Sequence, residues 1–231
     1  IKINIFVSTI NSLPKYSEIF KIKNNFHTLI IDEASQLLEP QIVGFLPLFK
    51  KWIFIGDDYQ LPPVVLQSEK NSKSNSNNLK DIHLYNFRES IFYRLKKNAI
   101  EKNWDNAYGV LKLHYRMHQN IAEFSKQSFY NNVIEEATEK QKKHINIPNL
   151  KYKDIFQQTL INTLKKSNII FINTPKSNIS KKNDIEAKLI SKIIPVIKAI
   201  DDKNDIGIIT PFRLQINNIK NTINDKYQNI Y

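Results

Sequence analysis

Two neighbouring carboxylates, Asp32 and Glu33, directly follow an apolar run in Thr28–Gln36 (TLIIDEASQ). The run predicts a buried strand, and ligands of open α/β sheets bind beyond the carboxyl ends of the strands. At such an edge the two acids would divide the work of phosphoryl transfer: Asp32 holds Mg²⁺ through its water shell, and Glu33 orients and deprotonates the attacking water. Asp32 acting only as a cap for the next segment is the alternative. Gln36 lies beside the pair and is a candidate to bind the same ligand.

A second apolar run ends in the same way, in Trp52–Pro63 (WIFIGDDYQLPP). Asp57 is the matching candidate acid, and Gln60 follows it closely. A glutamine amide can sense a γ-phosphate or its attacking water without changing the charge of the site. An ordinary turn at residues 56–58 is the alternative. Two acid-tipped strands in succession, each with a glutamine nearby, favour a phosphate site over two unrelated turns.

Arg116 lies in Leu111–Ile121 (LKLHYRMHQNI), which predicts a strand followed by a helix. A guanidinium is always charged and can bind two phosphate oxygens at once, so a half-buried Arg on a second domain can act as an arginine finger. Pairing of Arg116 with a carboxylate of its own domain is the alternative. His114 and His118 flank this arginine, but no HExxH pattern or third ligand accompanies them, so we do not predict a metal there.

The segment Thr210–Gln215 (TPFRLQ) directly follows an apolar run near the end of the sequence. Thr210, Pro211 and Arg213 would therefore lie at a sheet edge that a bound strand of nucleic acid can pass. The alternative is the start of a helix, because proline is favoured near helix N-termini.

Composition restricts the class of partner. The 231 residues carry 34 Lys and Arg against 22 Asp and Glu, a net charge of +12, which favours a polyanion such as nucleic acid. Only four of the 34 are Arg, and a Lys-rich, Asn-rich chain is also what AT-rich codons supply, so compositional drift is the alternative. The absence of Cys excludes disulfides and Cys-held metals, and no apolar window predicts a membrane span.

Four short apolar runs predict strands: Phe26–Ile31, Trp52–Ile55, Ile169–Ile172 and Ile206–Thr210. Uninterrupted apolar runs are typical of parallel strands that are covered on both faces. Between the last two runs, Asp184–Ile200 has apolar residues at helical spacing, from Ile185 onward, which completes a strand–helix–strand unit. The alternation predicts an α/β fold with parallel sheets.

Other segments define the domain organisation. Ile3, Ile5 and Val7 predict an N-terminal strand, and Ser68–Lys80 is a polar tract that predicts a solvated insertion. Phe87–Lys97 predicts a helix that closes the first half, so we expect a boundary near residue 100 and domains of residues 1–100 and 101–231. Residues 135–166 allow no assignment.

The segments DEASQ, GDDYQLPP and LHYRMH, in this order and spacing, resemble motifs of the superfamily 1 helicases that include senataxin and the nonsense-mediated-decay helicase. VSTINSLP, EPQIVGFLPL, RESIFYRL and IGIITPFRLQI are most similar to the replication helicase–nuclease that trims Okazaki-fragment flaps. The resemblance implies a P-loop NTPase with RecA-like parallel sheets. Residues 1–100 would be the C-terminal part of the first RecA-like domain, and residues 101–231 the N-terminal part of the second.

The resemblance also implies roles for residues. Asp32 would hold Mg²⁺, Glu33 would activate water, Gln60 would sense the γ-phosphate of ATP, and Arg116 would be the finger from the second domain, which agrees with the roles argued from the residues themselves. It further implies 5′-to-3′ movement along single-stranded DNA in a nuclear replication and repair enzyme. The residues expected to contact the strand are Thr9, Pro62, Thr210, Pro211 and Arg213.

Two departures from the family pattern keep alternatives open. His118 after YRM matches the RNA-helicase branch, so an RNA or RNA–DNA hybrid helicase like senataxin remains the second hypothesis. The 231 residues contain no GxxxxGK[ST] phosphate loop, so a non-catalytic nucleic-acid-binding module is the third. Under the first two hypotheses the phosphate loop, the last arginine motif and any nuclease domain lie in other parts of the full-length chain.

Overall fold

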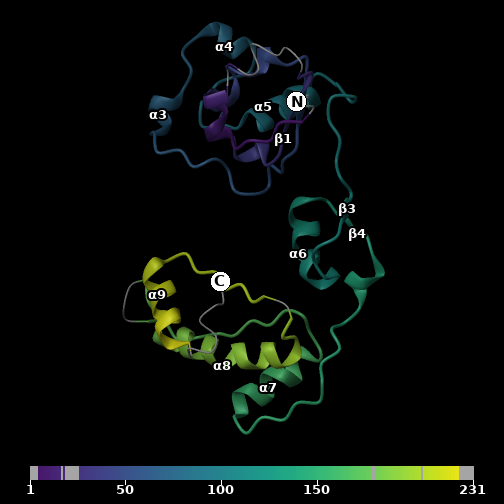
Figure 1. Cartoon of the computed structure of the whole chain (residues 1–231), viewed down its shortest axis with the longest axis vertical. Coiled ribbons are helices and arrows are strands. Elements are labelled where there is room, and N and C mark those ends of the chain that lie inside the picture. Colours follow the sequence, from purple (N-terminus) through teal and green to yellow (C-terminus); the bar gives the residue numbers. More distant parts are fainter. Residues whose placement is uncertain (1–4, 17, 19–25, 178–180, 204, 224–231) are drawn as a thin grey trace. The chain divides into compact units, whose positions relative to one another are not determined.

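The computed structural model describes residues 5–16, 18, 26–177, 181–203 and 205–223. The chain divides into two compact units, Ile1–Val110 and Leu111–Tyr231 (Figure 1). Each unit has its own elements and its own apolar clusters. The two units are therefore described separately.

The first unit is built on two parallel strands, β1 (Thr28–Ile31) and β2 (Lys51–Phe54), which pair from Thr28 with Lys51 to Ile31 with Phe54. This pairing confirms two of the predicted strands and their parallel direction. The remaining elements of the unit are η1 (Ile10–Tyr16), η2 (Ala34–Gln36), α2 (Glu39–Ile42), η3 (Leu46–Leu48), α3 (Glu69–Ser72), α4 (Asn77–Asp81) and α5 (Ile91–Glu101).

The core of the first unit covers one face of this small sheet. Leu29, Ile31 and Phe54 pack on a cluster that includes the buried Ile42 and Ile91. On the opposite face, the paired Ile30 and Ile53 are 62% and 37% exposed. The expectation that both faces are covered is thus wrong for the described residues, because Ile30 and Ile53 stay exposed.

Helix α5 begins four residues later than predicted, at Ile91, because the Ser90 hydroxyl accepts a hydrogen bond from the backbone N–H of Tyr93 and caps the helix. The polar tract is also more ordered than predicted. It contains α3 and α4, it buries Ser72, and Lys73 forms an antiparallel bridge with Asn86. Main-chain pairing with residues 85–87 therefore anchors a segment whose composition predicted a solvated loop.

A buried ion pair holds α5 against α2. The Arg94 guanidinium donates from Nε to Glu39 Oε2 at 2.7 Å and from Nη2 to Glu39 Oε1 at 2.5 Å, and both side chains are less than a tenth exposed. Arg94 Nη1 also donates to the Ile82 carbonyl at 2.8 Å. Arg94, one of the four arginines, therefore has a structural role: it holds α5 against α2.

Replacing Arg94 with Met is expected to lower the free energy of unfolding of the first unit by about 3 kcal/mol, because Glu39 stays buried without its counter-charge. Urea titration followed by Trp fluorescence measures this change, since Trp52 and Trp104 both lie in this unit. The matched control is Lys97→Met, which removes an exposed pair with Glu101 at 4.0 Å. Equal unfolding curves for the two variants would contradict the assignment.

The second unit begins with β3 (Leu113–His114), which pairs in parallel with β4 (Glu135–Glu136) on either side of α6 (Gln119–Phe129). The predicted strand–helix order of this segment is confirmed. The unit continues with η4 (Glu139–Lys142), α7 (Ile155–Leu164), α8 (Asp184–Ile200) and α9 (Arg213–Thr222).

The predicted helix over Asp184–Ile200 is confirmed as α8, which has two apolar sides. Ala187 and Ile194 pack with Ile219 of α9, whereas Val196 packs with Leu160 and Ile161 of α7. Ile185, which the helical spacing placed in the core, is 45% exposed instead.

The two strands predicted around α8 are wrong: neither Ile169–Ile172 nor Ile206–Thr210 pairs with a described strand. Both segments partly bury alternate residues, so Ile170 and Ile208 pack on the clusters around α8 while Phe171 and Ile209 are 89% and 98% exposed. Their backbones lack partner strands among the described residues, and side-chain packing on α8 takes the place of sheet pairing.

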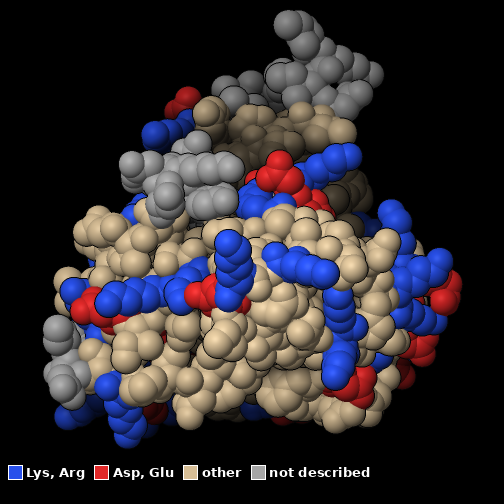
Figure 2. All heavy atoms as spheres, turned by 90° about the horizontal axis from the view of Figure 1, so that it is seen from below, with Lys and Arg blue, Asp and Glu red and all other residues tan. Residues whose placement is uncertain are grey.

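The predicted N-terminal strand is also not found. Ile5 and Val7 form no strand and are 81% and 88% exposed, and Ile3 lies outside the described residues. Among the helices of the described residues, none has the length and apolar character needed to cross a bilayer. On the face seen in Figure 2, Lys and Arg side chains are spread over the surface, and Asp or Glu side chains accompany several of them.

Candidate active site

The residues that follow β1 and β2 lie along one edge of the sheet because the strands are parallel. The backbone N–H of Ile55 donates to the Ile31 carbonyl at 2.8 Å, and the N–H of Ala34 donates to the Ile55 carbonyl at 2.8 Å. The N–H of Asp57 then donates to the hydroxyl of buried Ser35 at 3.3 Å. These bonds join the two loops directly beyond the strands. We call this the acidic edge, comprising Asp32, Glu33, Gln36, Asp57 and Gln60.

Gly56 makes the close approach of the two loops possible. A Cβ atom on this residue would lie 2.8 Å from the backbone nitrogen of Ser35, a distance that real Cβ atoms do not adopt. Any other residue would therefore push the loop that carries Asp57 away from the loop that carries Glu33.

Glu33 has an unusual backbone conformation, with φ of 53° and ψ of 35° in the left-handed region. This conformation costs a residue with a Cβ atom free energy, and such strain concentrates at functional sites. It directs the chain into η2 directly after the strand and leaves the Glu33 side chain exposed. The local strain is consistent with a functional role for the residue.

Each glutamine of the acidic edge donates to a carboxylate of its own loop. Gln36 Nε2 donates to Glu33 Oε2 at 3.1 Å, and Gln60 Nε2 donates to Asp57 Oδ2 at 2.9 Å. Asp32 Oδ1 accepts from the neighbouring Glu33 backbone N–H at 3.0 Å, and its side chain stays exposed. Glu33 itself is the N-cap residue of η2, which has no side-chain cap bond, so the capping alternative for Asp32 finds no support. The acids and amides are thus held in place and remain accessible to a ligand.

The residues present fit a magnesium ion bound to a nucleotide. Mg²⁺ in nucleotide sites keeps several waters and takes one or two carboxylates together with phosphate oxygens. Asp32 supplies such an exposed carboxylate. Among the described residues no group of three or more acids, His or Cys could hold an ion.

Arg116 lies in the loop between β3 and α6, and its exposed position corrects the expected half-buried one. Among the described residues it forms no ion pair, so the alternative of a carboxylate partner in its own unit finds no support. The neighbouring Tyr115 is 72% exposed. Arg116 therefore presents an uncompensated guanidinium to solvent.

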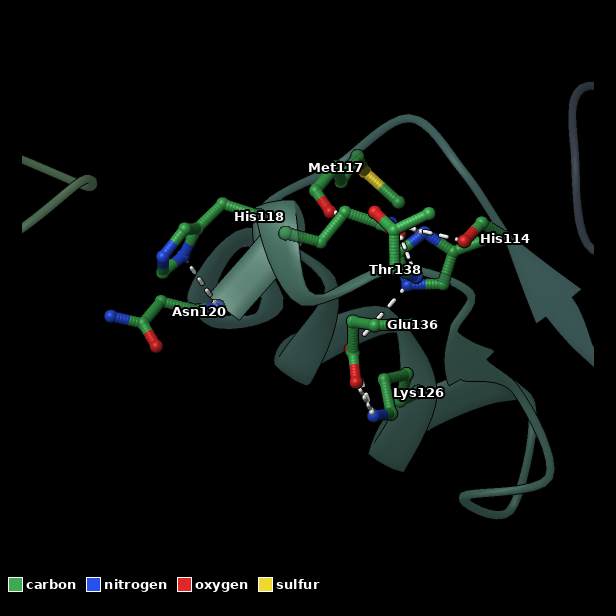
Figure 3. A network of polar contacts seen from close by, with 8 residues as sticks. His114, Met117, His118, Asn120, Lys126, Glu136 and Thr138 are labelled. Carbon is green, nitrogen blue, oxygen red and sulfur yellow. Dashed lines mark hydrogen bonds and ion pairs between the residues drawn. The ribbon is translucent and has the colours of Figure 1, made fainter. Parts of the chain in front are cut away.

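The backbone on both sides of Arg116 is fixed by polar contacts (Figure 3). On one side, His114 Nε2 lies 3.4 Å from Glu136 Oε1, and Lys126 Nζ donates to the same oxygen at 3.0 Å. On the other side, His118 caps α6, its Nδ1 accepting from the backbone N–H of Asn120 at 3.1 Å. His114 and His118 thus each make a structural contact of their own.

The hydrogen bond from the Lys126 ammonium is the largest cause that holds the pKa of Glu136 below its ordinary value of 4.5, and the contact with His114 adds to it. Because folding lowers this pKa, ionised Glu136 stabilises the unit above about pH 4.5, and that contribution disappears as the pH falls through the lowered pKa.

Glu136→Gln is therefore expected to destabilise the protein most at neutral pH, and the difference from wild type should shrink toward zero in acid. Urea titrations followed by circular dichroism between pH 7 and pH 3 measure it. Glu139→Gln, which removes an exposed pair with Lys142, is the control. A difference that does not change with pH would show that the ionised pair is not its cause.

The residues expected to contact nucleic acid divide between the units. In the first unit, Thr9 is exposed, bonding Ser12 through its hydroxyl, and Pro62 is exposed beyond the acidic edge. In the second unit, Arg213 is exposed at the first residue of α9, which shows that TPFRLQ begins a helix. Thr210 and Pro211 line an open hollow of about 330 Å³ together with Lys181 and Lys182.

Sequence reasoning missed two polar residues that organise these segments. Gln215 is buried, exchanges hydrogen bonds with the backbone of Asn183 at 2.8 and 3.0 Å, and so ties α9 to the start of α8. Gln141 is buried beside the Arg116 loop. The Thr138–Gln141 spacing is a local capping pattern, but the bonds that tie each glutamine to another segment join residues at least 24 positions apart and have no local signal. Their roles are visible only in the folded chain.

Known proteins with similar sequences include helicases. "DNA replication ATP-dependent helicase/nuclease DNA2" of Bos taurus is 32% identical over 213 residues, which cover 84% of this chain and 18% of that protein. "Helicase sen1" of Schizosaccharomyces pombe is 28% identical over 214 residues, covering 88% and 11%. "DNA polymerase alpha-associated DNA helicase A" of Saccharomyces cerevisiae is 28% identical over 223 residues, covering 87% and 29%. The chain thus spans less than a third of each relative.

Two family models match the chain, and both are described as an AAA domain. One matches residues 87–231 and the other residues 2–68. The matches confirm the resemblance that the motifs indicated and agree with the α/β class. Because the first model covers more than half of the chain and these relatives are named as helicases, the chain belongs to the AAA domain family found in superfamily 1 helicases.

Proposed function

We propose that the protein containing these residues is an ATP-dependent DNA helicase that couples ATP hydrolysis to 5′-to-3′ movement on single-stranded DNA in nuclear replication and repair. The observation that carries the proposal is the acidic edge, where exposed Asp32, Glu33 and two glutamines and half-buried Asp57 follow two parallel strands. Such an edge is where nucleotides bind in α/β sheets. The named helicase relatives support the same class of activity.

In this proposal the acidic edge performs the hydrolytic chemistry. Glu33 accepts a proton from the attacking water, because an ionised carboxylate is a hydrogen-bond acceptor alone and this one is exposed. Gln36 orients Glu33 through its 3.1 Å hydrogen bond. Gln60 exchanges its bond with Asp57 for one with the γ-phosphate, and Asp32 holds the magnesium ion. When bound, Mg²⁺ neutralises charge on the phosphate oxygens.

We assign the arginine finger to Arg116. Its guanidinium carries a full charge, has no acidic partner among the described residues, and lies on a unit other than that of Glu33. A finger from a second domain makes hydrolysis depend on domain closure, which in turn can move a bound strand. The expected strand contacts are Thr9, Pro62, Thr210, Pro211 and Arg213.

An RNA or RNA–DNA hybrid helicase is the second candidate, supported by the similarity to the protein named Helicase sen1. The His118 pattern that first pointed this way is weakened as an argument about substrate, because His118 caps α6 through its Nδ1 atom. A module that binds nucleic acid without hydrolysing ATP is the remaining alternative. A nuclease domain elsewhere in the full-length chain would make the protein a helicase–nuclease, as the name of the DNA2 relative describes.

Unwinding assays on the full-length protein test the proposal. We expect ATP hydrolysis that single-stranded DNA stimulates, and unwinding of a DNA duplex with a 5′ tail in preference to an RNA duplex. Preference for RNA or a hybrid would replace the first candidate by the second. Strand binding without any hydrolysis would favour the third.

The 231-residue polypeptide alone is expected to show no ATP hydrolysis and only weak binding of single strands. Its sequence contains no phosphate loop to hold the β- and γ-phosphates, whereas its net charge of +12 still attracts a polyanion. Fluorescence anisotropy with a labelled oligonucleotide at 50 and 200 mM salt should show affinity falling steeply as counterion release weakens. Rapid hydrolysis by this polypeptide would contradict the prediction.

A further inference from the structure

The side chain of Gln141 spans from η4 to the loop that carries Arg116. It is 7% exposed. Its Nε2 atom lies 3.0 Å from the carbonyl oxygen of His114 and 3.0 Å from that of Met117, the residues that enclose Tyr115 and Arg116. A single amide group thus forms hydrogen bonds with the loop on both sides of Arg116.

The orientation of this amide follows from its partners. Gln141 Oε1 accepts from the backbone N–H of Thr138 at 3.0 Å and lies 3.2 Å from the Thr138 hydroxyl. The backbone N–H can only donate, and the two carbonyls of the loop can only accept. The amide oxygen must therefore face Thr138, and the amide nitrogen must face the loop.

A chain of polar contacts runs from His114 to Glu136 and Lys126 (Figure 3). Gln141 Nε2 also lies 3.0 Å from His114 Nδ1, while the other ring nitrogen faces Glu136, which Lys126 holds. The amide nitrogen carries two protons, which the two loop carbonyls take, so His114 Nδ1 lies beside it as a third, close polar contact. The loop is thus connected through Gln141 and His114 to β4 and α6.

We propose that Gln141 is a positioning residue for the Arg116 finger, an assignment that rests on the proposed function. The amide fixes the backbone at residues 114–117 while the Arg116 side chain stays exposed and without an acidic partner among the described residues. A finger must reach a transferring phosphate with little error, because misplacement by about 1 Å can cost about 100-fold in rate. Gln141 supplies that precision from η4, a segment outside the Arg116 loop.

Two variants separate the two ends of the amide. Gln141→Leu removes both, whereas Gln141→Glu keeps an acceptor for Thr138 and loses the donor that grips the loop. The matched control is Gln127→Leu, an exposed glutamine of α6 in the same unit that bonds the neighbouring Glu123. The two variants thereby separate the effect of losing the Thr138 bond on stability from the effect of losing the bonds to the Arg116 loop.

Limited trypsin digestion of the full-length protein, in the absence of ATP, measures how readily the Arg116 loop is cleaved. We expect both Gln141 variants to speed cleavage after Arg116 by about tenfold, since two hydrogen bonds to the loop are lost. Cleavage after Lys192 and Lys198 of α8 should stay at the wild-type rate, as should every site in Gln127→Leu. Unchanged cleavage after Arg116, or equal acceleration at all sites, would overturn the inference.

Steady-state ATP hydrolysis supplies the second readout. Both Gln141 variants should lower kcat about tenfold or more with little change in KM for ATP, and should have no further effect in an Arg116→Ala background. Additive losses would overturn the positioning role. If Arg116→Ala alone left kcat unchanged, the finger assignment of the proposed function would fail, and the trypsin result would still decide whether Gln141 holds the loop.

Discussion

Glu33→Gln in the full-length protein is expected to lower kcat for ATP hydrolysis by about 10²- to 10⁴-fold, the range that general-base catalysis contributes. Gln has the same shape and can still accept the hydrogen bond from Gln36, so the loop should keep its form. It cannot accept a proton from water. Binding of ATP should therefore persist while turnover is lost.

The measurement pairs steady-state hydrolysis with equilibrium binding of a fluorescent ATP analogue. Glu69→Gln changes an exposed acid of α3 in the same unit and is the matched control, for which wild-type turnover is expected. Wild-type turnover in Glu33→Gln would remove the water-activating role from this residue. Loss of binding together with turnover would show a role in holding the nucleotide instead.

Arg116→Ala is expected to have the larger effect, a loss of about 10³- to 10⁵-fold in kcat, as for other arginine fingers. The charge that a finger supplies acts in the transition state, so KM for ATP should change little. Arg116→Lys should recover only a small part of the loss, because an ammonium cannot bind two phosphate oxygens in the plane of a guanidinium.

Lys112→Ala provides the control for Arg116, since it removes another exposed cation from the same segment. If it lowered kcat as much as Arg116→Ala, the effect would come from general charge rather than from a finger. Normal kcat in Arg116→Ala, with weaker strand binding, would move Arg116 from the hydrolytic site to the nucleic-acid contacts.

The acidic edge was predictable because both of its strands are short apolar runs that end in acids, and the two strands pair with each other. The runs at 169–172 and 206–210 have the same pattern but no partner strand among the described residues. An apolar run predicts that at least one side of the segment is buried. It does not predict whether a neighbouring strand is available for pairing. The two confirmed strands have such a neighbour, and the two wrong ones have none among the described residues.

Long-range polar contacts were beyond sequence reasoning. Arg94 and Glu39 are 55 positions apart, and nothing near either residue indicates a buried pair. Gln141 lies in a region that allowed no assignment. Its bond with Thr138 is local, but its contacts with the Arg116 loop join residues 24 to 27 positions apart. By contrast, the start of α5 could be refined from sequence, because Ser90 is a favoured capping residue directly before the apolar helix face.

The central claim is that Glu33 and Arg116, from separate units, act on the terminal phosphate of one nucleotide. The most direct measurement is an experimental structure of the full-length protein with magnesium, ADP and aluminium fluoride, which imitates the phosphate in transfer. We predict the Glu33 carboxylate beside the attacking water and the Arg116 guanidinium on the fluoride ligands. A structure in which Arg116 points to a surface remote from the nucleotide would contradict the account.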